Sequence, residues 1–539
     1  MNKLHKSIIT SLMASSMLFS CSKDYLTRDN PTATTDAKWW RLETDLYNNL
    51  EVIYVNQMSP GPLLTSATYQ ANCRMHMSGI TDESVFRANF GSWSAYPQGA
   101  VTASDGYLSD TYRQNYIDIR NACRILENYS RVYMENTTVK EQRAAEARAL
   151  RARAHLNLFL FFGPIPIVDK SQDPTAQAIK RNTQEEVVNF ITTELDKAAD
   201  ILPATYSSTD AYRMSKGACY AMQVQLYLSL KNYAKVIEYA KKLMALGVYD
   251  LHYSTKAGVN SYAQLFSYDA LENKERIIFR RTGCSGAFFR LAPKSLSGQA
   301  CNGPTAAMVN TYETKQGKTL QELGQDSLMV YWKNPLYKNN RDPRLEASVL
   351  VPGQTFVNRL LDPFSAGSTD PIGAAQSTQT GFWVKKYVDP ADVSRNNAGT
   401  MNFMITRYAE ILLSYVEALV ESGDWQNPDV VLYLNKIRNR AGMPNVDVSI
   451  YNTQDKIREL YRRERKVELA FEGTRIFDIR RWQIGPDVLS GPTMGAINPG
   501  TGQPVVVETR IFNPKRDYLW PIPLQELNAN NLMLQNPNW

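Results

Sequence analysis

The chain has few of the residues that build metal or nucleophilic sites, with four histidines and six cysteines in 539 residues. His76, His155 and His252, the three beyond the first twenty residues, are scattered, which argues against a histidine metal site or a catalytic triad. No two cysteines form a Cys-x-x-Cys pair, so a zinc or redox site is not expected. We therefore expect no metal, no cofactor and no catalytic residue.

The sequence also lacks blocks of like charge and an evident pair of carboxylates placed for catalysis. The formal net charge is +7, without a lysine- or arginine-rich block that would indicate nucleic acid as a partner. Asp82 and Glu83 are adjacent, and in an extended chain their side chains point in opposite directions. A glycosidase needs two carboxylates held about 5–10 Å apart across one bond. We therefore expect a binding protein and not an enzyme.

Long apolar runs are limited to the N-terminus, where residues 1–20 have the features of a targeting signal. A basic start precedes an apolar stretch that is too short to span a bilayer. Cys21 follows directly, which is the arrangement of a lipobox; the alternative is an ordinary secretory signal with an incidental cysteine. Residues 21–36 are polar and suit a flexible tether. We expect a signal peptide over 1–20 and lipidation of Cys21, which would anchor the protein to a membrane.

Most of the remaining chain, from residue 37 to 539, has the apolar spacing of paired helices. The clearest pair covers 215–230 and 233–246, and its alternating small and large residues resemble a tetratricopeptide repeat. A degenerate second copy covers 405–423 and 428–442. Further helices are expected near 38–57 and 107–133, from the capping-box spacing at Thr138 to Gly163, and from the capping box at Thr183. The prediction is a mostly α fold, a scaffold of tetratricopeptide-repeat-like helix pairs.

Two long stretches, 63–106 and 284–383, interrupt this scaffold. The second is rich in glycine, proline, serine and asparagine, and both have poor helical periodicity. We expect irregular insertions that include short strands, and loops of this kind commonly carry binding sites. Cys284 and Cys301 lie in the second insertion, where they could form a disulfide or remain as buried thiols.

The charged run from Tyr461 to Trp482 is the most informative segment. Glu464 falls on one helical face with a row of apolar residues, and a carboxylate facing a core needs partners. The run itself offers four candidate partners, Arg462, Arg463, Arg465 and Arg475. Gly473 is expected to break the helix. We interpret the run as a structural ion-pair network that holds two helices together.

This run closely resembles the C-terminal signature of the SusD/RagB family, surface lipoproteins that capture nutrients for a TonB-dependent outer-membrane transporter. Further matching segments, in order, are Cys21 with Asp24-Tyr25-Leu26, residues 146–155, residues 162–167, residues 407–413, residues 437–442 and residues 519–539. The resemblance implies a lipid-anchored protein of the outer membrane that faces the cell exterior. It also implies a SusC-like TonB-dependent transporter as partner and oligosaccharide or polysaccharide as ligand.

Aromatic residues in the two insertions are the candidate binding residues, because sugar rings stack on flat aromatics while polar groups bind their hydroxyls. The resemblance places a glycan platform on loops at about these positions. The candidates are Arg87, Asn89, Trp93 and Tyr96 in the first insertion, and Phe288, Phe289, Arg290, Tyr331 and Trp332 in the second. Trp93 and Trp332 are the best among them. The alternatives are a peptide-binding receptor of the same architecture and a repeat scaffold of the envelope without a ligand.

Overall fold

The computed structural model describes residues 39–58, 74–88, 90–172, 178–206, 209–280, 286–337, 340–395 and 399–539. The signal peptide, Cys21 with its tether, Asn89 and Cys284 lie outside the described residues, so the predictions for them stay predictions. Within the described ranges, none of the helices is both long enough and apolar enough to cross a membrane.

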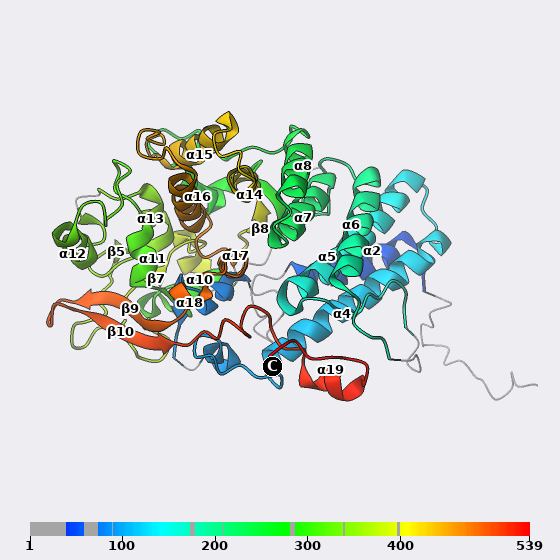
Figure 1. Cartoon of the computed structure of the whole chain (residues 1–539), viewed down its shortest axis with the longest axis horizontal. Coiled ribbons are helices and arrows are strands. Elements are labelled where there is room, and N and C mark those ends of the chain that lie inside the picture. Colours follow the sequence, from blue (N-terminus) through cyan, green and yellow to red (C-terminus); the bar gives the residue numbers. More distant parts are fainter. Residues whose placement is uncertain are drawn as a thin grey trace, which may run out of the picture.

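Helix pairs form the scaffold and confirm the mostly α prediction. The main helices are α2 (Glu43–Gln57), α4 (Gly106–Asn128), α5 (Thr137–Phe162), α6 (Gln184–Ile201), α7 (Lys216–Ser229), α8 (Tyr233–Met244), α14 (Tyr408–Glu421), α15 (Pro428–Ala441), α16 (Gln454–Glu468) and α17 (Arg475–Trp482). Successive helices pack against each other from α4 to α8, and α8 then packs against α14. Figure 1 shows this series of helices at one end of the molecule and the loop-rich segments at the other.

Most of the predicted helix ends are confirmed. Thr183 forms the expected capping box with Glu186, and α15 begins at a proline and ends before Gly442 in the left-handed conformation. Two starts differ. The cap of α5 is Asn136, whose side chain accepts from the Val139 amide, and not Thr138. α14 begins only at Tyr408, because the five preceding residues form a strand.

The loop-rich segments contain short strands that pair in twos, all antiparallel. The pairs are β1 (Ser84–Phe86) with β3 (Asn302–Pro304), β2 (Arg276–Arg280) with β8 (Phe403–Arg407), β4 (Val349–Leu350) with β7 (Trp383–Val384), β5 (Thr355–Phe356) with β6 (Arg359–Leu360), and β9 (Gly491–Asn498) with β10 (Gln503–Arg510). The β1–β3 pair joins the two predicted insertions, which are far apart in the sequence.

Most of the shorter helices lie in the same region, whereas the last of them lies beside the helix series (Figure 1). They are α3 (Arg74–Met77), α9 (Ser261–Leu265), α10 (Ala287–Leu291), α11 (Ala306–Thr311), α12 (Gln325–Lys333), α13 (Pro343–Ser348), α18 (Gly485–Val488) and α19 (Leu524–Ala529). Single 3-10 turns occur at Ser78–Ile80, Gly91–Ala95, Tyr129–Arg131, Tyr268–Ala270, Lys294–Leu296 and Pro390–Arg395. The β9–β10 hairpin and α12 lie together at the end of the molecule opposite the helix series (Figure 1).

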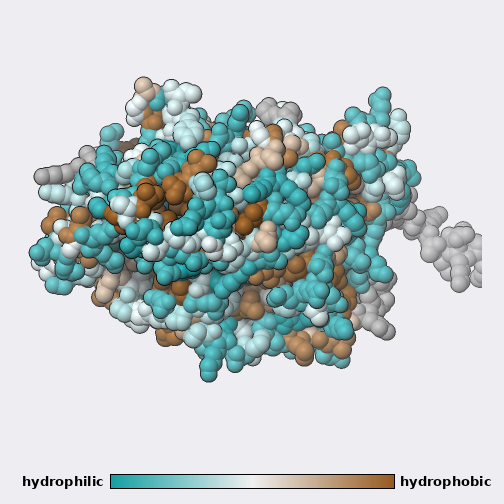
Figure 2. Space-filling view, turned by 45° about the horizontal axis from the view of Figure 1, so that its top comes forward, coloured by the Kyte–Doolittle hydropathy of each residue, from teal (hydrophilic) through white to brown (hydrophobic). Residues whose placement is uncertain are grey.

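One hydrophobic core runs through both regions. The C-terminal tail closes it: Trp520 stacks on Phe161 of α5 with ring centroids 4.2 Å apart, and its amide donates to the Phe161 carbonyl at 2.8 Å. The tail therefore covers the end of the first long helix. The face of the molecule in Figure 2 is mostly hydrophilic, with apolar patches scattered between polar side chains.

Candidate functional site

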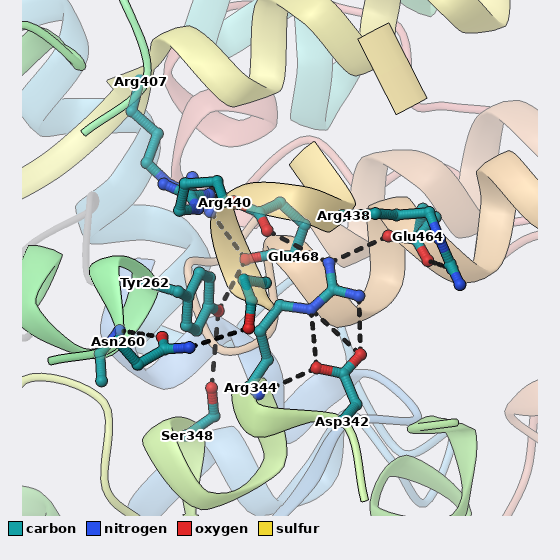
Figure 3. Close-up of polar contacts among 12 residues, drawn as sticks. Asn260, Tyr262, Asp342, Arg344, Ser348, Arg407, Arg438, Arg440, Glu464 and Glu468 are labelled. Atoms are coloured by element: carbon teal, nitrogen blue, oxygen red, sulfur yellow. Dashed lines mark hydrogen bonds and ion pairs between the residues drawn. The ribbon is translucent and has the colours of Figure 1, made fainter. Parts of the chain in front are cut away.

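The inner face of α16 carries a buried carboxylate cluster (Figure 3). Glu468 is fully buried and accepts from Arg407 at 2.7 Å, from Arg344 at 3.3 Å, and also from Arg440. Burial alone would raise the pKa of Glu468, but these three guanidinium groups together hold it well below its ordinary value. Glu464, one turn earlier, is also buried. The cluster therefore has a structural role, as the sequence predicted.

The predicted partners of Glu464 are wrong. Its carboxylate accepts from Arg344 at 3.0 Å and from Arg438, both outside the charged run. Three predicted partners instead bind other carboxylates. Arg465 binds Asp478 at 2.9 Å, Arg475 binds Asp82 at 2.8 Å, and Arg463 binds Glu313 at 2.8 Å. The partners assigned to Glu464 were Arg462, Arg463, Arg465 and Arg475. Arg462, Arg463 and Arg465 lie one or two positions from Glu464, so their side chains leave α16 on other faces and do not bind its carboxylate.

Gly473 has a steric reason to be glycine, although α16 already ends at Glu468. Its φ is +75°, and a Cβ there would lie 2.6 Å from the carbonyl oxygen of Arg74. Only glycine allows this close approach without strain. The turn brings α17 back beside the first insertion.

The opposite face of α16 lines a groove built from two adjoining cavities. The first, of about 510 Å³, lies between α11, α12, α16 and α17. The second, of about 400 Å³, lies between α11, α12, α18 and the β9–β10 hairpin. Both are lined by Ala307, Asn310 and Lys466, so they form one continuous depression, the α16 groove. It is a candidate site because it is large, combines apolar walls with several charged side chains, and lies beside the loop insertions.

Asp82 of the first insertion organises the cations of the groove. Its carboxylate accepts from Lys466 at 2.8 Å and from Arg475 at 2.8 Å. Burial would raise the pKa of Asp82, but Arg475 and Lys466 hold it well below its ordinary value, so it is ionised. Its neighbour Glu83 has its pKa raised to about 8, by burial and then by the charge of Asp82. Glu83 is therefore mainly neutral at pH 7. Asp82 alone of these two residues balances the positive charges of Lys466 and Arg475.

Arg462 and Trp482 form one wall of the first cavity. The Arg462 guanidinium lies 4.6 Å from the centroid of the Trp482 ring, and its Nη2 is 3.8 Å from the Oε1 of Glu421. The side chain of Arg462 is 31% exposed. Trp482 is oriented by its indole N–H, which donates to Glu417 at 2.8 Å. Arg462 is thus only loosely paired with the Glu421 carboxylate, and its side chain is accessible from the groove.

Trp332 and Asn310 supply the neutral part of the groove. Trp332 is half-buried, lines the second cavity, and donates from its indole N–H to the Gly495 carbonyl at 3.4 Å. Asn310 lies where the two cavities adjoin, and its Oδ1 is buried without a hydrogen-bond partner. An aromatic ring for stacking and an unused acceptor for a hydroxyl are what a sugar requires.

Two candidates from the first insertion belong to an aromatic cluster. Trp93 is fully buried, with its ring centroid 3.9 Å from that of Tyr107. Tyr96 is half-buried and packs between Trp93 and Trp520, at 5.7 and 5.4 Å. A ring without exposed surface cannot stack on a sugar, so the prediction for Trp93 is corrected: it is a packing residue. Its aromatic neighbours cover it, and sequence spacing could not reveal that.

The other candidates either lie in the core or lie at a second location outside the α16 groove. Phe288 is buried in the core and is corrected in the same way. The β1–β3 pair brings Arg87 near Arg290; the Arg87 amide donates to the Cys301 carbonyl at 3.0 Å, and Arg290 donates to Gln299 at 2.8 Å. Arg87, Arg290 and Phe289 are half-buried and do not line the α16 groove. Cys301 itself is a buried free thiol.

Tyr331 also faces away from the groove. Its side chain is buried, its ring packs against Tyr337 at 5.8 Å, and its hydroxyl accepts from Asn340 at 2.8 Å. Of the predicted residues that the structure describes, Trp332 is the one that lines the α16 groove.

The sequence reasoning missed the groove residues of the charged run, because it assigned the whole run to the structural network. These residues are Arg462, Arg463, Lys466, Arg475 and Trp482. A signal was present: Arg462 and Lys466 are each two positions from Glu464, about 200° around the helix. A helix with an inward carboxylate at Glu464 must therefore turn both cations outward. In the part of the chain that the structure describes, no group of three or more histidine, cysteine, aspartate or glutamate side chains could hold a metal ion.

Stacked helix pairs with long loop insertions define the chain as a tetratricopeptide-like helical protein. It belongs to the SusD family, whose model matches residues 264–539, just over half of the chain. A second family model, described as "Starch-binding associating with outer membrane", matches residues 31–228. The two matches together extend over most of the chain and agree with the resemblance seen in the sequence.

Proteins described as SusD-like align with most of the chain. SusD-like protein P2 of Formosa agariphila is 27% identical over 456 residues, which is 81% of each chain. Among solved structures, a SusD-like carbohydrate binding protein of Bacteroides fragilis is 25% identical with a TM-score of 0.81, and the match covers 92% of this chain and 99% of that one. A second SusD-like protein of the same organism is 25% identical with a TM-score of 0.78, covering 94% and 99%.

Proposed function

We propose that the protein is a non-enzymatic receptor that binds oligosaccharide at the outer membrane and passes it to a SusC-like TonB-dependent transporter. The observation that carries the proposal is the α16 groove, where a half-buried tryptophan and an unused amide oxygen lie together. Its membership of the SusD family supports the proposal, as does the likeness to a carbohydrate binding protein of Bacteroides fragilis.

Binding of the purified protein to a panel of polysaccharides, measured by isothermal titration calorimetry, tests the receptor function. We expect Trp332→Ala to weaken binding about tenfold or more, because a central stacking tryptophan carries about 2 kcal/mol or more of binding free energy. Trp425→Ala is the matched control, because Trp425 is also half-buried but lies outside the groove. Equal affinity of both variants would exclude Trp332 from the site.

The same panel tests the absence of catalysis and the peptide alternative. Incubation with the protein should release no reducing sugar from any polysaccharide that it binds. Tight binding of peptides without any glycan binding would favour the peptide receptor over the proposed one.

Anchoring is the second part of the proposal. Residues 1–20 are the signal peptide, residues 21–36 the tether, and acylated Cys21 the anchor to the outer leaflet, which holds the receptor at high effective concentration beside its transporter. Cys21→Ser should abolish incorporation of labelled palmitate and release the protein from the membrane fraction. Retention of both label and membrane association in this variant would contradict the assignment.

A further inference from the structure

We infer that the glycan bound in the α16 groove is acidic and carries carboxylate or sulfate groups. This inference rests on the proposed glycan-binding function and specifies its ligand class. It is argued from the charges that line the groove, from their internal pairing, and from the neutral groups beside them.

The groove has an excess of positive charge. Its two cavities are lined by five cationic side chains and by two acidic ones, Asp82 and Asp487. One of the cations, Arg510, is fully engaged inside the protein, with Glu508 and with the carbonyls of Thr81 and Ser84. The four that remain are Arg462, Arg463, Lys466 and Arg475, all on α16 or α17. Asp82 and Asp487 cannot neutralise these four.

Among these four cations, Arg462 is the one whose donors are available to a ligand. Lys466 and Arg475 share the single carboxylate of Asp82, and Glu83 beside it is mainly neutral at pH 7. Arg463 donates to Glu313 from its Nε at 2.8 Å and to the Tyr451 hydroxyl from its Nη2 at 2.5 Å. Arg462 donates from its Nε to the Tyr461 hydroxyl at 3.5 Å, and its Nη2 makes only a 3.8 Å contact with the nearest carboxylate. An anionic ligand would therefore gain charge-assisted hydrogen bonds without breaking an internal pair at Arg462.

The shape of the site explains why the anion should belong to a sugar. The cations lie along the first cavity, while Trp332 lines the second and Asn310 lies where the two adjoin. A free anion would not use the tryptophan or the amide acceptor. A neutral oligosaccharide would take water from the loosely paired Arg462 without giving it a charged partner, which is costly. A chain of sugars with acidic substituents uses both parts, because guanidinium groups bind carboxylate and sulfate oxygens in pairs.

The inference is tested with polyanions and their neutral counterparts. The probes are polygalacturonate with its methyl-esterified form, carrageenan with its desulfated form, and poly-L-glutamate as a polyanion without sugar. We expect the protein to bind at least one charged glycan about tenfold or more tightly than its neutral counterpart. Its binding should weaken as sodium chloride rises from about 50 to 500 mM, because salt screens these charges.

Arg462→Gln is the decisive variant, because it removes one loosely paired cation from the groove. We expect it to weaken binding of the charged glycan about tenfold, the equivalent of about 1.4 kcal/mol, without changing the affinity for the neutral form. Lys456→Gln is the matched control: Lys456 is an exposed cation of the same helix outside the groove and should have no effect.

The possible failures are distinguishable. Equal affinity for charged and neutral forms, or an unchanged affinity in Arg462→Gln, would overturn the acidic ligand and leave the receptor function standing. Failure of the folded protein to bind any of the polysaccharides, or binding of poly-L-glutamate alone, would overturn both the inference and the proposed function.

Discussion

The two faces of α16 carry cations and carboxylates of the same chemical type in opposite environments. On the inner face, Glu468 is surrounded by arginines whose side chains are 1% exposed or less. On the outer face, the side chains of Arg462, Arg463 and Lys466 are 31%, 16% and 11% exposed. The inner arginines are each held by one or more short contacts to carboxylates, whereas Arg462 is not.

The difference teaches that charge density alone does not identify a binding site. Desolvation makes an unpaired charge in the core costly, so every inner cation has carboxylate partners. Water and ligand can serve the outer cations, so their pairing can remain incomplete. The outer face of α16, whose cations are not all closely paired with carboxylates, is the face that lines the α16 groove. Substitutions that break ion pairs should therefore lower the free energy of unfolding more on the inner face of α16 than on its outer face.

The largest effect is expected from Glu468→Ala. The substitution leaves Arg344, Arg407 and Arg440 buried with one fewer carboxylate, which should lower the free energy of unfolding by about 3–5 kcal/mol. Thermal unfolding followed by circular dichroism measures it. Glu459→Ala, an exposed glutamate of the same helix, is the control and should be nearly neutral. Similar melting temperatures for both variants would mean that the cluster does not stabilise the fold.

An intermediate effect is expected from the pH dependence at Glu83, which lies behind the groove. Its pKa is raised to about 8, so between its ordinary pKa and pH 8 the folded state keeps a proton that the unfolded state releases. This contribution to stability is complete at low pH and is lost as the pH rises through about 8. Glu83→Gln stays neutral, so the wild type should lose up to about 3 kcal/mol relative to this variant between pH 5 and pH 8. Parallel pH profiles of the two melting temperatures would contradict this pKa.

The smallest effect on stability is expected from Arg462→Gln. Because this side chain is partly exposed and loosely paired, its loss should change the free energy of unfolding by less than about 1 kcal/mol. Arg440→Gln, a fully buried counterpart paired with Glu275 and Glu468, should be far more destabilising. Thermal melts of the two variants, made side by side, provide the comparison. Equal losses would show that both faces of α16 are structural.

The predicted scaffold came from signals that act over one or two helical turns. The capping box at Thr183, the proline start and glycine end of α15, and the α7–α8 pair depend on nearby backbone groups and on apolar spacing, and all three are present. Trp332 was selected as an aromatic residue of the second insertion, although the structure places it on helix α12. The start of α14 was missed because strand β8 continues the same apolar pattern.

The rest of the site depended on contacts between distant segments. Asp82 meets Arg475 across 393 positions, and Arg344 meets Glu464 across 120. Trp93 resembles a binding residue in the sequence, but in the structure Tyr107 packs on it, and Tyr107 in turn packs against the tail residue Trp520. No local pattern specifies these neighbours.

By itself, the sequence determined the mostly helical fold, the inward orientation of Glu464 and the family resemblance, because backbone hydrogen bonds and helical periodicity are local. Only the tertiary structure decided which tryptophans are covered and which cations of α16 lack a full set of carboxylates. The physical reason is that burial and ion pairing depend on which distant segments pack together. The same charged helix therefore holds the core together on one side and lines the groove on the other.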